Sequence, residues 1–234
     1  DIRQQRVETL LSYHDVPCII LSRDLPVLHE LIEEARKTGC PILRSDKMTT
    51  ALMNDLFFYL NEKLAPQTSM HGVLMDVSGV GILLTGHSGI GKSETAMDLI
   101  KRGHRLVADD SVIVKRVAGD LIGSAPEMIR YFMELRGIGI INIKNMYGSG
   151  SVLDRKEIEL VMELENWDEG KVYDRLGEGA QYETILGVKV LKHIIPVKPG
   201  RNLSIIIEVA ARNFRLKSMG YDAAQELISR TIGR

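Results

Sequence analysis

The chain has 234 residues, of which 44% are hydrophobic, and its 30 lysines and arginines against 31 aspartates and glutamates give a net charge of −1. This composition is typical of a globular protein, and the near-neutral charge, together with the lack of an apolar run of about 20 residues, predicts no nucleic-acid partner and no membrane partner. Cys18 and Cys40 have no metal-ligand spacing, and a chain of this length can bury its core without a disulfide, so we expect a reducing, cytoplasmic location.

Residues 1–64 have the pattern of a small α/β unit. Residues 17–21 and 41–43 are short apolar runs typical of buried strands, and residues 25–37 have the spacing of an amphipathic helix that Gly39 ends. Ser45 or Asp46 is placed to cap a second helix that runs to about residue 64. The polar segment 65–69 predicts a linker, so the expected domains are residues 1–64 and 70–234.

The second part interleaves strands with helices. Residues 70–77 and 79–85 are β-patterned and are joined by a tight turn at Ser78 and Gly79, and residues 105–115 predict a further strand that leads to a turn at 118–120. Residues 127–135 predict a short helix, residues 158–167 and the run to 197 predict strands, and one or two helices follow from residue 202. The pattern indicates an α/β domain with a central sheet flanked by helices.

A glycine-rich loop between an apolar strand and a helical segment is the strongest chemical signal. Its eight residues satisfy G-x-x-x-x-G-K-[ST] and are Gly86, His87, Ser88, Gly89, Ile90, Gly91, Lys92 and Ser93. In such a loop, backbone N–H groups and the positive end of the following helix bind phosphate oxygens, while the lysine supplies a mobile charge and the serine a hydroxyl for Mg²⁺. The alternative is a glycine-rich turn that binds nothing, or an anion loop without catalysis.

Two carboxylates follow the next predicted strand. Asp109 and Asp110 come after an apolar run, and strands that leave the same edge of a sheet end near the phosphate loop. Because neighbouring side chains on a strand alternate in direction, we expect the two carboxylates to have different roles. The alternative, that one or both only begin a loop, has similar weight. No guanine-reading Asn-Lys-x-Asp motif is present, which favours ATP over GTP.

Three further segments carry weaker signals. His71, before the loop strand, is by itself more typical of an ordinary strand-end histidine than of a catalytic one. Residues 134–142 place two glycines in an apolar run beside Glu134 and Arg136, where glycine weakens a strand unless backbone must approach something closely. Residues 196–202 form a stiff turn with Lys198 and Arg201, which can present positive charge to a phosphate or can be a solvated basic loop.

Taken together, the segments GHSGIGKSE, LVADD, MELRGIGIIN, DRLG and IPVKPGRN resemble the HPr kinase/phosphorylase family over nearly the whole chain. The resemblance implies that residues from about 70 onward form the catalytic domain and that residues 1–64 are the latter part of an N-terminal domain. It implies a bifunctional bacterial enzyme and a homohexamer. His87 stands where many members of the family carry an acidic residue.

The activity that the resemblance implies has two directions. The enzyme phosphorylates a serine of HPr, the phosphocarrier of the sugar phosphotransferase system, with ATP or pyrophosphate. It also removes that phosphate by phosphorolysis, in which inorganic phosphate attacks and pyrophosphate is formed. The ratio of ATP to phosphate then selects the direction, and the activity regulates carbon metabolism.

The same resemblance assigns residues. The positions that match the family's active site are His71, Lys92, Asp110 and Arg175. Ser93 and Glu134 match the magnesium ligands, residues 133–142 match a segment needed for both reactions, and residues 196–201 match one tied mainly to dephosphorylation. Asp110 is then the base that takes the serine proton and the acid that returns it, and Lys92, Arg175 and Mg²⁺ hold the phosphoryl charge.

Two other functions share the phosphate loop. A kinase for a small metabolite would use the same loop and carboxylate, although the sequence gives no clear mark of a lid or an acceptor pocket. A nucleotide-sensing regulator would bind ATP without turnover and would use the small N-terminal unit for association. Incubation with labelled ATP and HPr separates the HPr kinase from the metabolite kinase, and the regulator predicts nucleotide-dependent association without phosphate transfer.

Overall fold

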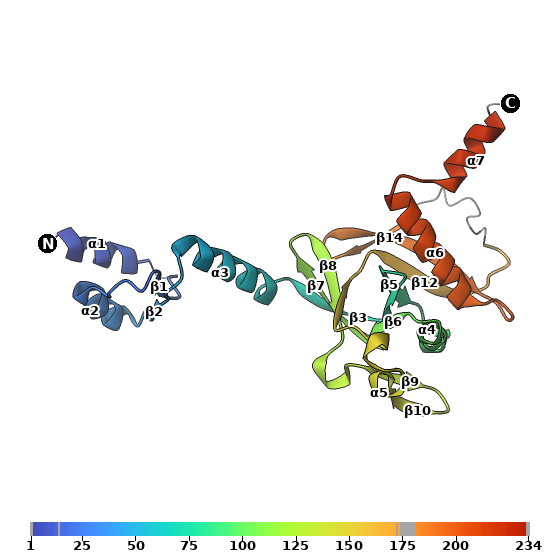
Figure 1. The fold of residues 1–234 in the computed structure, drawn as a ribbon, viewed down its shortest axis with the longest axis horizontal. Coiled ribbons are helices and arrows are strands. Elements are labelled where there is room, and N and C mark those ends of the chain that lie inside the picture. Colours follow the sequence, from blue (N-terminus) through green and yellow to red (C-terminus); the bar gives the residue numbers. More distant parts are fainter. Residues whose placement is uncertain (1, 14, 172, 174–180, 233–234) are drawn as a thin grey trace. The chain divides into compact units, whose positions relative to one another are not determined.

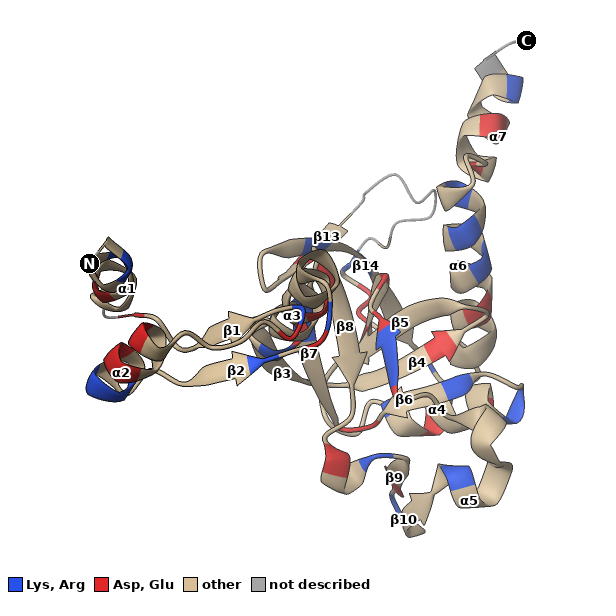
Figure 2. Ribbon diagram, turned by 60° about the vertical axis from the view of Figure 1, so that its left-hand side comes forward, with Lys and Arg blue, Asp and Glu red and all other residues tan. Residues whose placement is uncertain are grey.

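The computed structural model describes residues 2–13, 15–171, 173 and 181–232. The chain divides into two compact units, Asp1–Leu64 and Ala65–Arg234 (Figure 1). Acidic and basic residues are interspersed over the elements of both units (Figure 2). Among the described residues, no helix has the length and apolar character needed to cross a bilayer.

Over its described residues, the first unit contains three helices and a small parallel sheet. The helices are α1 (Ile2–Leu11), α2 (His29–Thr38) and α3 (Thr49–Lys63), and the strands β1 (Ile19–Leu21) and β2 (Ile42–Arg44) pair in parallel. Gly39 ends α2 with a left-handed backbone, as predicted, whereas α1 was not predicted. The predicted cap at Ser45 or Asp46 is wrong: the chain bends at Asp46 and Lys47, and α3 begins only after the extended Met48, which provides no side-chain cap.

Two sheets organise the second unit. The larger sheet has the strand order β13-β14-β12-β5-β4-β6, and the smaller has the order β11-β8-β7-β3. The strands of the larger sheet are β4 (Val73–Val77), β5 (Val80–Thr85), β6 (Arg105–Ala108), β12 (Leu160–Asn166), β13 (Gln181–Ile185) and β14 (Val188–Val197). The strands of the smaller sheet are β3 (Gln67–His71), β7 (Ser111–Val117), β8 (Asp120–Ser124) and β11 (Arg155–Glu157).

The larger sheet is buried on both faces. Ile82 and Leu84 of β5 belong to a core cluster with helices α4 (Lys92–Lys101) and α6 (Leu203–Ser218), while Leu83 belongs to a second cluster with Val112 and Leu121 of the smaller sheet. The unit therefore has three layers, helices, larger sheet and smaller sheet, which confirms the predicted α/β class with a central sheet. Because β4 is antiparallel to both β5 and β6, and β12 is parallel to β5, the carboxyl ends of β5, β6 and β12 share one edge.

Two predicted strands are each divided between the two sheets. The run predicted as one strand over 70–77 is β3 followed by β4, with Gly72 at the crossing, and β3 begins at Gln67, earlier than predicted. A side chain at Gly72 would place its Cβ 2.6 Å from the carbonyl oxygen of Leu84, so only glycine fits there. The run 105–115 likewise breaks at Asp109 and Asp110, between β6 and β7. A change of sheet leaves no mark in the apolar pattern, which is why the sequence predicted continuous strands.

The predicted helix over 127–135 is wrong. A single 3-10 turn, η1 (Glu127–Ile129), precedes β9 (Phe132–Leu135), which pairs antiparallel with β10 (Gly139–Asn142). Met133 is buried while its neighbours Phe132 and Glu134 are exposed, an alternation that belongs to a strand. The remaining helical segments are α5 (Ile143–Tyr147), η2 (Ser149–Ser151) and α7 (Ala223–Ile232). The turn predicted at Ser78 and Gly79 is confirmed, with φ of 53° and 87°.

Candidate active site

The phosphate loop, residues 86–93, connects the end of β5 to the start of α4. Gly86 has a φ of +133°, and a Cβ there would lie 2.4 Å from the carbonyl oxygen of Leu164 on β12. Gly89 has a φ of +85°, and its Cβ would lie 2.7 Å from Nη1 of Arg136. Both positions favour glycine because of their positive φ, and at Gly86 the backbone of the neighbouring strand also leaves no room for a side chain.

Lys92 is a buried residue of this loop. Its Nζ donates hydrogen bonds to the carbonyl oxygens of Gly86, at 2.9 Å, and His87, at 3.1 Å. Burial lowers the pKa of Lys92, and the nearby carboxylates of Asp109 and Asp110 oppose that shift. The amine is thus held by backbone acceptors inside the cradle, in the position from which a lysine can contact a bound phosphate.

Asp109 is buried and ties three elements together. Ser93, in the first turn of α4, donates a hydrogen bond from Oγ to Oδ1 of Asp109 at 3.0 Å. The backbone N–H of Glu134 on β9 donates to Oδ2 at 3.1 Å. Burial raises the pKa of Asp109, and these two hydrogen bonds oppose the shift. Since both oxygens are occupied, Asp109 is suited to hold its neighbours in place.

Asp110 has the opposite environment. Its side chain is 73% exposed, and its Oδ1 lies 3.1 Å from Nδ1 of His71, which is itself 53% exposed. Its backbone is in the left-handed region, with a φ of 66°, and its carbonyl oxygen accepts a hydrogen bond from the N–H of Gly72. This strained turn directs the carboxylate to solvent, where it can exchange a proton with an incoming group.

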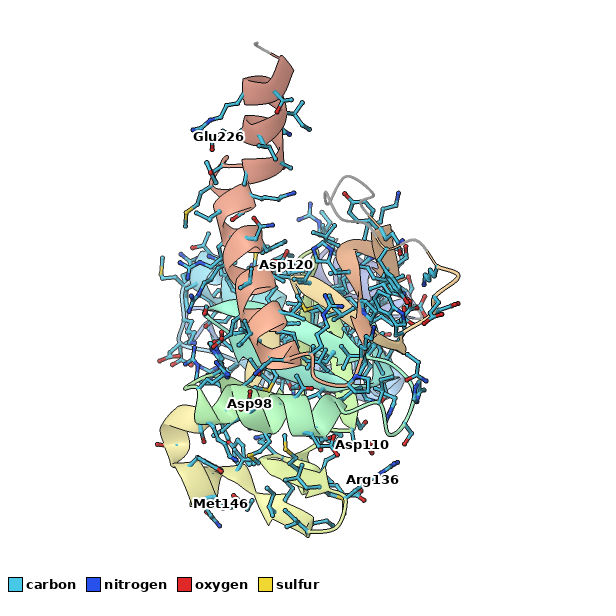
Figure 3. The ribbon with its side chains drawn as sticks, turned by 90° about the vertical axis from the view of Figure 1, so that its right-hand side faces the viewer. Asp98, Asp110, Asp120, Arg136, Met146 and Glu226 are labelled. Atoms are coloured by element: carbon cyan, nitrogen blue, oxygen red, sulfur yellow. The ribbon has the colours of Figure 1, made fainter. Side chains whose placement is uncertain are left out.

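The β9–β10 hairpin closes the other side of the site. Nη2 of Arg136 donates a hydrogen bond to Oγ of Ser88 in the phosphate loop at 3.0 Å. Figure 3 shows Arg136 and Asp110 on the same side of the molecule, where α4 and the hairpin approach each other. The guanidinium is one of the groups that lower the pKa of Lys92, so two cations share this small region.

These elements enclose a cavity of about 230 Å³. Ten of the sequence-predicted residues line it: His71, Ser88, Gly89, Gly91, Lys92, Ser93, Asp109, Asp110, Glu134 and Arg136. Val73 and Glu94 also line it and were not predicted. Glu94 directly follows the loop motif, so its place in the first turn of α4 was a usable signal.

Oxygen ligands for a divalent cation are present in the cavity. Ser93, Asp109 and Glu134 line it together, and hydroxyl and carboxylate oxygens are the ligands that Mg²⁺ prefers. Within the described part of the chain, no cluster of three or more His, Cys, Asp or Glu side chains has the arrangement of a metal site. The residues therefore fit a Mg²⁺ ion held partly by protein and partly by phosphate oxygens, not a closed protein site.

Other predicted residues lie away from the cavity. Arg201 donates from Nη1 to the carbonyl oxygen of Pro196 at 3.1 Å, and Nζ of Lys198 lies 5.2 Å from the ring centre of Trp167. Both belong to the turn after β14, and neither lines the cavity. Arg175 lies outside the described residues. Gly86, His87 and Ile90 complete the phosphate loop without lining the cavity.

Comparisons with known proteins all identify relatives of one family. The model of the HPr serine kinase C-terminal domain matches residues 62–231, and that of the HPr serine kinase N terminus matches residues 1–60. HPr kinase/phosphorylase of Peptoclostridium acidaminophilum is 53% identical over 224 residues, which are 95% of this chain and 72% of that protein. HPr kinase/phosphorylase of Bacillus subtilis is 51% identical over 230 residues, 97% of this chain and 74% of the relative.

A solved structure agrees with these relatives. The Hpr(Ser) kinase/phosphatase from Coxiella burnetii superposes with a TM-score of 0.63 at 37% identity, over 68% of this chain and 98% of that one. Both domain models together span nearly all of the sequence, and the curated relatives match it almost from end to end. The chain therefore belongs to the HPr serine kinase family.

Proposed function

We propose that this protein transfers a phosphoryl group from ATP or pyrophosphate to a serine of HPr, and that it removes the group by phosphorolysis. The family and the names of the relatives support this function. The observation that carries it is the exposed Asp110 carboxylate beside His71, in the same cavity as the buried ammonium of Lys92. That arrangement places a proton acceptor next to a phosphate site.

In the forward direction, Asp110 accepts the proton of the serine hydroxyl as the bond from its oxygen to phosphorus forms. In the same transfer, the bond from phosphorus to the leaving group breaks; this group is ADP when ATP is the donor and phosphate when pyrophosphate is the donor. Lys92 and Arg136 lie where they can hold the charge of the transferring group, and Arg175 is proposed for the same role on the family resemblance. Mg²⁺, when bound through Ser93 and Glu134, would neutralise phosphate charge.

In the reverse direction the same carboxylate acts as an acid. Protonated Asp110 gives its proton to the leaving serine oxygen while an oxygen of inorganic phosphate attacks phosphorus, and pyrophosphate is formed. His71 is proposed to orient the carboxylate, since its Nδ1 lies 3.1 Å away. Asp109 is proposed to hold Ser93 and the hairpin, because its two oxygens already accept hydrogen bonds.

The remaining proposals rest on the family resemblance. Residues 196–201, with Lys198 and Arg201, act mainly in dephosphorylation, and the assembly is a homohexamer. Residues 1–64 are a partial N-terminal domain, and residues 70–234 are the catalytic domain. We place the protein in the bacterial cytoplasm, which the free thiols of Cys18 and Cys40 support.

One measurement tests the proposed function directly. Phosphoseryl-HPr is incubated with the protein and inorganic phosphate, and pyrophosphate is quantified. We expect pyrophosphate in an amount equal to the HPr that loses phosphate. Release of inorganic phosphate alone would indicate a hydrolase, and absence of both products, with phosphorylation of HPr by ATP also absent, would refute the proposal.

A further inference from the structure

The residue just before the β9–β10 hairpin has a strained backbone. Tyr131 has a φ of 69°, in the left-handed region that bulky side chains rarely adopt, because the Cβ then crowds the following carbonyl oxygen. Such a conformation persists only where the surrounding contacts hold it. Among the described strands, β9 and β10 pair only with each other, so contacts outside this pair must position the hairpin.

Several contacts hold Tyr131 in this conformation. Its phenol hydroxyl donates a hydrogen bond to Oδ1 of Asp154, and this bond is the main cause of the raised pKa of the phenol. Its ring packs against the main core cluster, and Nζ of Lys144 lies 4.8 Å from the ring centre. Its carbonyl oxygen accepts a hydrogen bond from the N–H of Ile143, the residue after β10, at 2.9 Å. Tyr131 therefore closes the base of the hairpin and also ties that base to Asp154.

Asp154 is itself fixed to the strand that leads into the cavity. The N–H of Leu153 donates to the carbonyl oxygen of Leu106 in β6 at 2.8 Å, which places Asp154 beside that strand. Asp109 directly follows β6 and accepts the N–H of Glu134 at 3.1 Å. Two carboxylates attached to β6 thus hold the hairpin, one at its base through a phenol and one in β9 through a backbone amide.

We propose that Tyr131 and Asp154 are a positioning pair, whose hydrogen bond sets the place of the β9–β10 hairpin at the candidate active site. The inference rests on the proposed function, because that function gives roles to Glu134 and Arg136 of the hairpin. Neither member of the pair lines the cavity, so the pair acts through those two side chains. Without the hydrogen bond, the strained turn relaxes and the hairpin no longer holds both side chains beside the phosphate loop.

The test removes each partner separately, and then both together, in the full chain. Tyr131→Phe keeps the ring and loses the hydroxyl, Asp154→Ala removes the acceptor, and Asp154→Asn restores a neutral acceptor. Tyr221→Phe is the matched control, because the hydroxyl of Tyr221 donates to Oε2 of Glu226 at 2.7 Å, which is also a phenol–carboxylate hydrogen bond. Figure 3 shows Glu226 far from Arg136 of the hairpin.

Two kinds of measurement are made on each variant. Hydrogen exchange, followed by mass spectrometry, reports the protection of the amides of residues 132–142 and needs no substrate. Initial rates with HPr and ATP, and with phosphoseryl-HPr and phosphate, give kcat in both directions and the Mg²⁺ concentration for half-maximal rate. Calorimetry gives the Kd of ATP without Mg²⁺, and thermal unfolding gives the stability of the whole chain.

We expect Tyr131→Phe and Asp154→Ala each to lower kcat about fivefold in both directions and to speed exchange in residues 132–142 by a similar factor. The half-maximal Mg²⁺ concentration should rise, because Glu134 is a proposed ligand. The double variant should lose no more than either single variant, and Asp154→Asn should recover part of the loss. The Kd of ATP should stay within about twofold, because the phosphate loop is unaltered, and Tyr221→Phe should change none of these quantities.

Unchanged kcat in Tyr131→Phe would overturn the proposal, and so would a lower kcat with unchanged exchange, because the hairpin would then not be the cause. Additive losses in the double variant would show that the two side chains act independently. Equal losses of ATP affinity and thermal stability would mean that the bond supports the whole unit, which also contradicts a positioning role. If the unaltered protein phosphorylates no HPr, the proposed function fails, whereas the exchange data still decide whether the bond holds the hairpin.

Discussion

The phosphate loop and the β9–β10 hairpin form two sides of one cavity, yet different forces hold them. Backbone geometry fixes the loop: its glycines have positive φ, Leu164 leaves no room for a side chain at Gly86, and two carbonyl oxygens hold Lys92. A few side chains hold the hairpin, mainly Met133 in the core and Arg136 on Ser88. Backbone geometry therefore fixes the loop and side-chain contacts fix the hairpin, so substitutions in the two should affect different measured quantities.

The largest effect is expected within the loop. Lys92→Ala removes the ammonium from the phosphate cradle, and we expect both transfer to HPr and phosphorolysis to fall by at least about 1,000-fold. Rates in both directions are measured with saturating substrates. Lys101→Ala, in the last turn of the same helix, is the matched control and should retain activity. Near-normal turnover of Lys92→Ala would show that the cradle assignment is mistaken.

The next largest effect is expected at Asp110, which lines the cavity between the phosphate loop and the hairpin. Asp110→Asn keeps the shape of the side chain but cannot take up the serine proton, so transfer should fall on the order of 100-fold while ATP still binds. Calorimetry with ATP and a transfer assay with HPr separate the two quantities. Loss of ATP binding together with transfer would mean that Asp110 holds the site together instead of moving a proton.

A smaller effect is expected where loop and hairpin meet. Gly89→Ala strains a residue with a φ of +85° and crowds Arg136, so ATP affinity should fall about tenfold. Gly103→Ala, at a φ of +90° with open space around it, adds similar strain without crowding and should leave ATP affinity intact. Adding Arg136→Ala removes the crowding together with the hydrogen bond to Ser88 and one cation, so Arg136→Ala alone is measured beside the double variant. If the double variant binds ATP no better than Gly89→Ala, the contact between loop and hairpin is unimportant for binding.

The burial of Asp109 predicts a pH signature. The pKa of the Asp109 carboxyl is raised in the folded state, so the folded state binds a proton there more readily than the unfolded state does. As pH falls toward the ordinary pKa of an aspartate, this difference increases the free energy of unfolding. Asp109→Asn removes that contribution. Urea denaturation should therefore show that the variant, compared with the unaltered protein, is relatively more stable at pH 7 than at pH 4.5. The reverse trend would indicate that hydrogen bonds outweigh burial.

The smallest effect is expected outside both regions. Arg201→Ala loses the hydrogen bond to the carbonyl oxygen of Pro196 and loosens the turn after β14. Phosphorolysis should fall about fivefold more than phosphorylation, if a bond of roughly 1 kcal/mol orders this turn for one reaction. Initial rates in both directions on the same preparation give the ratio. Equal losses would argue against a role specific to phosphorolysis.

The features that were predicted correctly from the sequence are those that depend on residues close together in the chain. The spacing of glycines and Lys92 is local, and the carboxyl ends of β5 and β6 share an edge, so the loop and the two aspartates come together as expected. The different environments of Asp109 and Asp110 were not predictable in detail, because they depend on the distant N–H groups of Glu134 and Gly72.

The hairpin escaped prediction for a related reason. Residues 127–135 contain apolar residues at spacings that also suit a helix, and only pairing with 139–142 decides between the two structures. Strand pairing is a contact between two segments, so the residue pattern of one short segment does not reveal it. The place of Lys198 and Arg201, outside the cavity, depends on where β14 ends in the sheet, which spacing does not encode.

The chain changes sheets at Gly72, and this has a mechanical consequence. Asp110 lies at the second place where the chain changes sheets, and the next residue, Ser111, pairs with His71 in the register of β7 with β3. The N–H of Gly72 also donates to the carbonyl oxygen of Asp110, so backbone pairing holds the carboxylate 3.1 Å from the imidazole. Substitutions that weaken the pairing of β3 with β7 would therefore misalign these two side chains and slow turnover, although they lie outside the phosphate loop.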